Sequence, residues 1–248
     1  MSHSLTLVIA YATICALWWG LSRVVPLWRQ VERPTFSRPW IEVGLALAAV
    51  IAVLFLGQLW SRGIRLSAPG AWQTVAESVN QLLIFCPVVL LPMIRKQSLA
   101  SAWIQRSRLW ARLAIGVGLA MLALLVFSAL ESGALSYWDT IKAVFRPANA
   151  HIAVQVLLED IAVAVIFVRV AAALQPRWAI LLVAALFAAG HLPAMLASGA
   201  SAAEIFGLVQ DFGLGVLVIG TVWRGADISW FWPVHFALDM TQFLKHAN

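Results

Sequence analysis

The stretch VGLALAAVIAVLFLGQLW, residues 43–60, is an unbroken apolar run without a single charged side chain. A helix needs about 20 mostly apolar residues to cross the hydrocarbon core of a bilayer, so this run predicts a membrane-spanning helix. The rest of the chain has the same character. Of its 248 residues 62% are hydrophobic and 11% are charged, and the mean hydropathy is +0.88. These proportions are typical of an integral membrane protein.

Apolar segments of spanning or near-spanning length follow one another along the whole chain. They are residues 5–21, 43–60, 79–94, 113–130, 152–174, 178–197, 205–222 and 228–243. The third is the weakest, because it is short and we expect Pro87 and Pro92 to interrupt it. No repeat or low-complexity tract divides the chain. We therefore expect an all-α, polytopic membrane protein with about eight transmembrane helices in a single helical membrane domain, residues 1–248.

The net charge of +6 arises from 17 Lys and Arg against 11 Asp and Glu. In a membrane protein basic residues mark cytoplasmic loops, so we expect the lipid bilayer as a partner and no nucleic acid. With eight spans, twelve of the 17 basic residues fall in odd-numbered loops. This bias predicts that the odd loops are cytoplasmic and that both termini lie outside. Tryptophans near the predicted span ends, including Trp28 and Trp230, are typical of an aromatic belt.

Ionisable side chains stand inside the last four predicted spans. An acidic residue at the centre of a spanning helix costs about 2.5–3.5 kcal/mol on insertion scales, so such residues usually mark a functional site. Several in neighbouring helices predict a shared polar cavity. The residues are Glu159, Asp160, His191, Asp211, His235 and Asp239.

Two of these acids also have a purely structural interpretation. Asp160 can be protonated and hydrogen-bonded to a neighbouring helix. Asp211 is accompanied by Gln210, Gly213 and Gly215, a composition that suits close helix packing with a polar cross-link. For Asp211 we favour the structural interpretation.

Three motifs occur in a fixed order: an acidic pair, Phe-x-x-x-His, and His-x-x-x-Asp. This pattern resembles the CAAX protease and bacteriocin-processing family of intramembrane endopeptidases (CPBP or Abi, type II CAAX prenyl protease-like). The resemblance covers residues 150–245, the predicted catalytic core, while the first four spans match the family only in number. It implies four catalytic residues and a supporting group in which we also place Asp211. The catalytic set is Glu159, His191, His235 and Asp239, and the supporting set is Asp160, Phe187 and Asp211.

One family residue is missing. The family has an arginine five residues after the first acid, where this chain has Ala164. Arg169 follows Glu159 by ten residues, about 15 Å along a helix, and cannot pair with it within that helix. We interpret Arg169 as a snorkelling residue at the cytoplasmic end of its span. Either the arginine is dispensable here, or the first motif is degenerate.

Peptide hydrolysis needs an activated water and stabilisation of the oxyanion. Glu159, removed from bulk water, suits the general base. His191 and His235 can hold the water or donate to the oxyanion, and Asp239 can orient His235 or bind the same water. Glu159, His191 and His235 could also ligate zinc with one open position. The chain has no His-Glu-x-x-His motif, so we favour a metal-independent reaction without a cofactor.

We therefore expect an intramembrane endopeptidase that cleaves a membrane-anchored protein or peptide near its anchor. The compact chain with short loops is typical of a multi-pass protein of a bacterial cytoplasmic membrane. Two alternatives stay open. One is a transporter or proton-relay protein, in which the same groups carry ions. The other is a catalytically silent immunity or scaffold member of the family.

Overall fold

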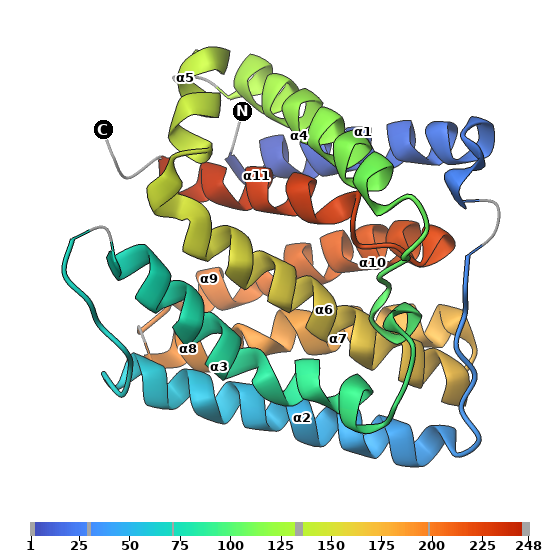
Figure 1. The fold of residues 1–248 in the computed structure, drawn as a ribbon. Helices are drawn as coiled ribbons and strands as arrows, with labels where there is room; N and C mark the ends of the chain where they lie inside the picture. Colours follow the sequence, from blue (N-terminus) through green and yellow to red (C-terminus); the bar gives the residue numbers. More distant parts are fainter. Residues whose placement is uncertain (1–2, 29–30, 71, 132–135, 198, 245–248) are drawn as a thin grey trace.

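The computed structural model describes residues 3–28, 31–70, 72–131, 136–197 and 199–244. Within these ranges every regular element is a helix (Figure 1). The longer helices are α1 (His3–Val24), α2 (Pro39–Ser61), α3 (Trp72–Ile94), α4 (Leu109–Leu130), α6 (Ala150–Ala173), α7 (Pro176–Gly190), α10 (Leu208–Gly225) and α11 (Phe231–Leu244). The short elements are α5 (Tyr137–Val144), α8 (Leu192–Ala197), α9 (Ala202–Phe206), η1 (Pro26–Trp28), η2 (Leu99–Ala102) and η3 (Pro147–Asn149). The predicted all-α class is confirmed.

The first four long helices have the length and composition of membrane spans. Helices α1 to α4 contain 22 or 23 residues each, with mean hydropathy between 1.7 and 2.6 in their most apolar windows. At 1.5 Å per residue each is about 33 Å long, enough for the hydrocarbon core of a bilayer. Helix α7 is apolar but shorter, with 15 residues. The chain is therefore a multi-pass membrane protein by these criteria.

Two of the helices differ in their bounds from the predicted segments. Helix α3 begins at Trp72 and runs without a break through Pro87 and Pro92, so the expected interruption is wrong. Prolines are tolerated in spanning helices because neighbouring groups satisfy the freed backbone. Helix α7 ends at Gly190, and His191 separates it from α8. His191 thus lies at a helix end and not within a continuous span.

Helix α6 is the central element of the bundle. It packs against α2 and α3 on one side and against α7 and α11 on others, as Figure 1 also shows. Every side chain from Ala164 to Val170 is buried, which is typical of a helix enclosed by protein. Helix α11 lies against α4, and α1 contacts both α4 and α10. The described part of the predicted catalytic core, residues 150–197 and 199–244, therefore contacts each of the first four long helices.

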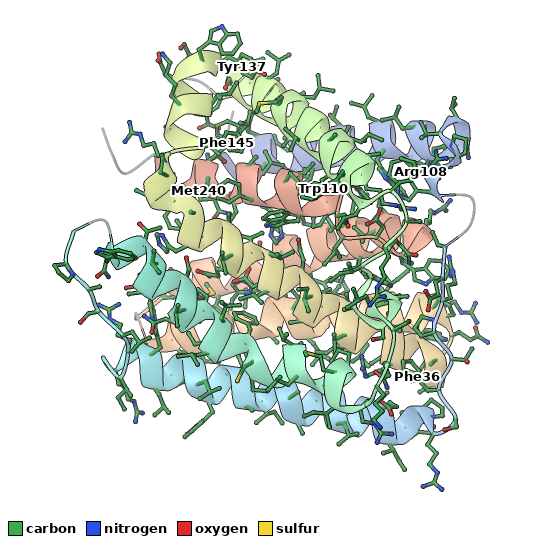
Figure 2. All side chains as sticks on the ribbon, viewed as in Figure 1. Phe36, Arg108, Trp110, Tyr137, Phe145 and Met240 are labelled. Atoms are coloured by element: carbon green, nitrogen blue, oxygen red, sulfur yellow. The ribbon has the colours of Figure 1, made fainter. Side chains whose placement is uncertain are left out.

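The helices alternate in direction, and their charges gather at one end. We call the end that carries the start of α2, α4, α7 and α11 the basic end; it lies on the right of Figure 1. The described basic residues at this end number eleven: Arg23, Arg33, Arg38, Arg95, Lys96, Arg106, Arg108, Arg112, Arg169, Arg177 and Arg224. The opposite end has Arg62, Arg65, Lys142 and Arg146. Figure 2 labels Arg108 at the basic end and Tyr137 at the opposite one.

Two buried ion-pair networks join helices at the basic end. In one, Glu42 of α2 accepts hydrogen bonds from Arg95 at 2.8 Å and Gln97 at 2.9 Å, and lies 3.4 Å from Arg169 of α6. The side chain of Arg169 is fully buried. The snorkelling interpretation of Arg169 is therefore wrong, because its guanidinium is held inside the protein by a carboxylate from a distant part of the sequence. Such pairs need good geometry to offset desolvation.

The second network contains Arg112 of α4 and Asp227, in the loop between α10 and α11. The two side chains are 1% and 0% exposed, and Arg112 Nη1 lies 2.7 Å from Asp227 Oδ2. Trp28 Nε1 donates to the same oxygen at 3.0 Å, and the backbone N–H of Ser229 donates to Oδ1 at 2.9 Å. Trp28 is therefore buried as a hydrogen-bond donor, and the expected aromatic-belt role is wrong for this residue.

Trp230 is also placed in the interior. It is fully buried and stacks on Trp18 of α1, with ring centroids 4.6 Å apart. The aromatic-belt interpretation is wrong for Trp230 as well, because α1 covers this side chain. Its position close to a predicted span end does not reveal that contact.

Close packing of α4 on the start of α11 leads to a stability prediction. A Cβ added at Gly116 would lie 2.5 Å from the carbonyl oxygen and 2.8 Å from the Cα of Trp230. Because backbone cannot move aside as a side chain can, Gly116→Ala should destabilise the fold by about 1–3 kcal/mol. A lowered thermal unfolding midpoint in detergent would measure this.

Gly118 is a matched control in the same helix, because a Cβ there meets nothing within 4 Å. Alanine is the better helix former, so Gly118→Ala should leave the midpoint unchanged or raise it. Equal midpoints for the two variants would contradict the close approach at Gly116.

Candidate active site

The acidic pair lies near the middle of α6, with its two side chains in different surroundings. Glu159 is half-buried and its Oε1 accepts a hydrogen bond from Gln155 Nε2 at 2.9 Å, one turn earlier. Asp160 is 6% exposed and faces α11. Adjacent helical residues point about 100° apart, so one carboxylate remains accessible while the other is enclosed.

Asp160 and His235 form the central contact of the site. Asp160 Oδ1 lies 2.9 Å from His235 Nδ1, joining α6 to α11 across 75 residues of sequence. The Asp160 carboxylate accepts, so Nδ1 of His235 donates to it, and Nε2 is left outside this bond, where it can donate when the ring is protonated. Within the described chain, the buried Oδ2 of Asp160 has no hydrogen-bond partner. The expected bond from Asp160 to a neighbouring helix is thus present, and its partner is a predicted catalytic residue.

Aromatic rings hold the imidazole of His235 in place. Phe231, one turn earlier on α11, stacks on it with centroids 5.3 Å apart and an interplanar angle of 29°. Tyr11 of α1 approaches it edge-on at 6.5 Å. The ring is thus fixed by three groups from three helices, because Asp160 supplies the third contact.

Asp239 lies one helical turn beyond His235. Its Oδ1 accepts a hydrogen bond from Gln242 Nε2 at 3.1 Å. The charges of Asp239, His235, Glu159 and His191 lie close enough to interact electrostatically. Orientation of His235 through Nδ1 therefore comes from Asp160 on another helix, and Asp239 contributes charge to the same cluster.

His191 belongs to the outer part of the cluster. It is exposed at the end of α7, and its Nδ1 lies 3.0 Å from the carbonyl oxygen of Phe187. Because a carbonyl only accepts, Nε2 of His191 is again the free nitrogen. The Phe187 ring lies edge-on against the imidazole at 5.1 Å, and Asp211 in the first turn of α10 interacts with it electrostatically. Phe187 therefore orients His191 through backbone and ring together.

Tyr11 is a site residue that the sequence motifs do not include. It is 7% exposed and lies near His235, and its hydroxyl interacts electrostatically with Asp239, Asp160 and Glu159. Tyr11 is one of two tyrosines in the chain and stands inside the first apolar segment. A polar hydroxyl in a predicted span was the available signal, but the family resemblance begins near residue 150.

The remaining sequence predictions concern metal and arginine. Among the described residues, no group of three or more His, Cys, Asp and Glu is arranged to hold a metal ion. The alternative in which Glu159, His191 and His235 ligate zinc stays a prediction. Ala164 is fully buried in the core, and Arg169, the arginine of α6, is paired with Glu42.

Together these features define a class: a helical, multi-pass membrane protein that carries acidic and histidine side chains on α6 and α11 and at the end of α7. We call these residues the acid–histidine cluster: Glu159, Asp160, His191, His235 and Asp239. Comparison of the chain with protein-family models found no match, and neither did comparison with curated proteins or with solved structures.

Proposed function

We propose that the protein is an intramembrane endopeptidase of the CPBP type, with eight membrane-crossing helices in a bacterial cytoplasmic membrane. The observation that carries this proposal is the hydrogen bond that His235 Nδ1 donates to Asp160, 2.9 Å long, with Glu159 next to Asp160 on α6. It unites the first and last motifs of the family pattern, which are 75 residues apart in sequence. Polar groups inside an apolar bundle cost free energy of insertion, and such groups usually mark a functional site.

In the proposed reaction Glu159 takes a proton from water as the oxygen attacks the substrate carbonyl. The Nε2 atoms of His191 and His235 face the chemistry, because their Nδ1 atoms are held by Phe187 and Asp160. With the rings protonated as imidazolium, their Nε2–H groups donate to the oxyanion and stabilise the negative charge of the tetrahedral intermediate. Glu159 then gives its proton to the leaving amine, the C–N bond breaks, and the carboxylate is restored for the next turnover.

A proton-relay function is the second candidate. The observation that favours it is the same buried Asp160–His235 pair, since carboxylate–imidazole pairs also pass protons in pumps and transporters. Both functions need titratable groups at this position, but only the endopeptidase creates new peptide termini. The third hypothesis, a catalytically silent family member, rests on Ala164, which stands where the family has an arginine.

The proposal is tested with His235→Gln, which keeps a side-chain donor towards Asp160 but removes the imidazole. Loss of one oxyanion donor should lower cleavage by about 10²–10³-fold. Membranes from cells that express the wild type or the variant, in a strain lacking the native gene, are compared by mass spectrometry of new peptide termini. The protein level and unfolding midpoint of the variant serve as controls.

Unchanged termini in His235→Gln would overturn the endopeptidase assignment. Loss of proton flux in reconstituted vesicles, without any change in termini, would establish the relay function in its place. A metal-independent enzyme is expected to keep its activity after prolonged dialysis against a chelator, whereas recovery of lost activity by added zinc would contradict that part of the proposal.

A further inference from the structure

The accessible part of the acid–histidine cluster faces away from the basic end. His191 is exposed at the end of α7, and Asp211 lies in the first turn of α10, both at the end opposite the basic residues (Figure 1). Asp239 follows His235 in the same direction along α11, and its partner Gln242 is exposed. Substrate can therefore meet the cluster from this opposite end.

The route from the basic end is filled by protein. Residues 226–230, which connect α10 to α11, are buried, and none is more than 5% exposed. Asp227 is held there by Arg112 and Trp28, and Trp230 is stacked on Trp18. His235 is four residues, about 6 Å, into α11, so this layer lies directly between His235 and the basic end.

A separate cavity lies at the basic end, and Ala226 of this layer forms part of its wall. Its volume is about 150 Å³, and its wall includes Glu32, Arg33, Trp103, Phe167 and Trp223. No residue of the acid–histidine cluster contributes to that wall. The cavity is therefore distinct from the site.

We propose that the substrate reaches the acid–histidine cluster from the extracytoplasmic side, an inference that rests on the endopeptidase function. Eleven of the described basic residues lie at the basic end and four at the opposite end, which places the basic end in the cytoplasm. The substrate class is then a membrane-anchored protein or peptide whose scissile bond lies in or just outside the outer half of the membrane. A cytoplasmic C-terminal tail does not fit this geometry.

Cysteine labelling tests the direction of access. Cys15 and Cys86 are replaced by alanine, and single cysteines are introduced by His191→Cys and Gln242→Cys as site reporters. Arg106→Cys and Arg146→Cys are surface controls for the basic and opposite ends, since both arginines are exposed. Right-side-out spheroplasts and inverted vesicles are treated with a membrane-impermeant maleimide and then with a permeant one.

We expect pretreatment of spheroplasts to abolish later labelling at the two site reporters and at Arg146→Cys, while Arg106→Cys is blocked only in inverted vesicles. Blocking of a site reporter only from the cytoplasmic face, or from neither face, overturns the inference. Labelling needs no turnover, so the two proposals can fail separately. If the wild type shows no cleavage while the site reporters are blocked from outside, the endopeptidase function is refuted and the direction of access stands. If the wild type cleaves but the site reporters are blocked only from the cytoplasmic face, the direction of access is refuted and the endopeptidase function stands.

Discussion

Glu159→Gln is expected to lower the rate of substrate cleavage by about 10²–10⁴-fold, the usual contribution of a general base. Glutamine has the size of glutamate and keeps an oxygen that can accept from Gln155, which now binds Glu159 at 2.9 Å. It cannot take a proton from water. The variant therefore removes the chemistry with little change in packing, and the measurement is the amount of new peptide termini in membranes.

Glu32→Gln is the matched control for this substitution. Glu32 is an exposed acid at the basic end, where it accepts a hydrogen bond from Ser98 at 2.6 Å, outside the acid–histidine cluster. Its variant should retain wild-type cleavage. If Glu159→Gln were as active as Glu32→Gln while folded to the same extent, Glu159 would not be the base and the family reading of the acidic pair would be wrong.

Arg112→Met is expected to destabilise the protein by about 3–5 kcal/mol, the largest stability effect that we predict. Arg112 and Asp227 are 1% and 0% exposed and their charged atoms are 2.7 Å apart. Methionine fills much of the volume but leaves the Asp227 carboxylate buried without its counter-charge, and this uncompensated charge is the source of the cost. The thermal unfolding midpoint in detergent measures it.

The double variant Arg112→Met, Asp227→Asn should recover a large part of that loss, because it removes the isolated charge and keeps an acceptor for the backbone of Ser229. Lys142→Met, which breaks an exposed ion pair with Asp139 at 3.4 Å, should leave the midpoint unchanged. A double variant no more stable than Arg112→Met would show that the cost comes from lost packing and not from the unpaired carboxylate.

The acidic and histidine residues of the site were recognisable in sequence because each violates the apolar rule of its segment. Their mutual contacts were not. Spacing on α11 suggested Asp239 as the residue that orients His235, whereas Asp160 of α6 holds Nδ1. Tyr11 was missed for the same reason, since helical spacing reveals neighbours within one helix and says nothing about α1.

The two buried arginines show most clearly what sequence position alone does not predict. Arg112 and Arg169 stand near span ends, where a long basic side chain is expected to reach water. Both are instead buried and paired with carboxylates from distant segments, Arg112 with Asp227 and Arg169 with Glu42. A basic residue at the end of an apolar run looks identical in either case, because the deciding partner is supplied by another helix.

By itself, the sequence determined the helical class, the run of long apolar segments and the presence of costly polar groups in the last four of them, because these follow from local composition and from the length of helix that a bilayer requires. Only the tertiary structure decided which polar groups meet, which arginines are buried and which side of the cluster stays open. Those outcomes depend on the packing of α1, α4, α6 and α11 against one another, and contacts between helices are not written in the periodicity of any one of them.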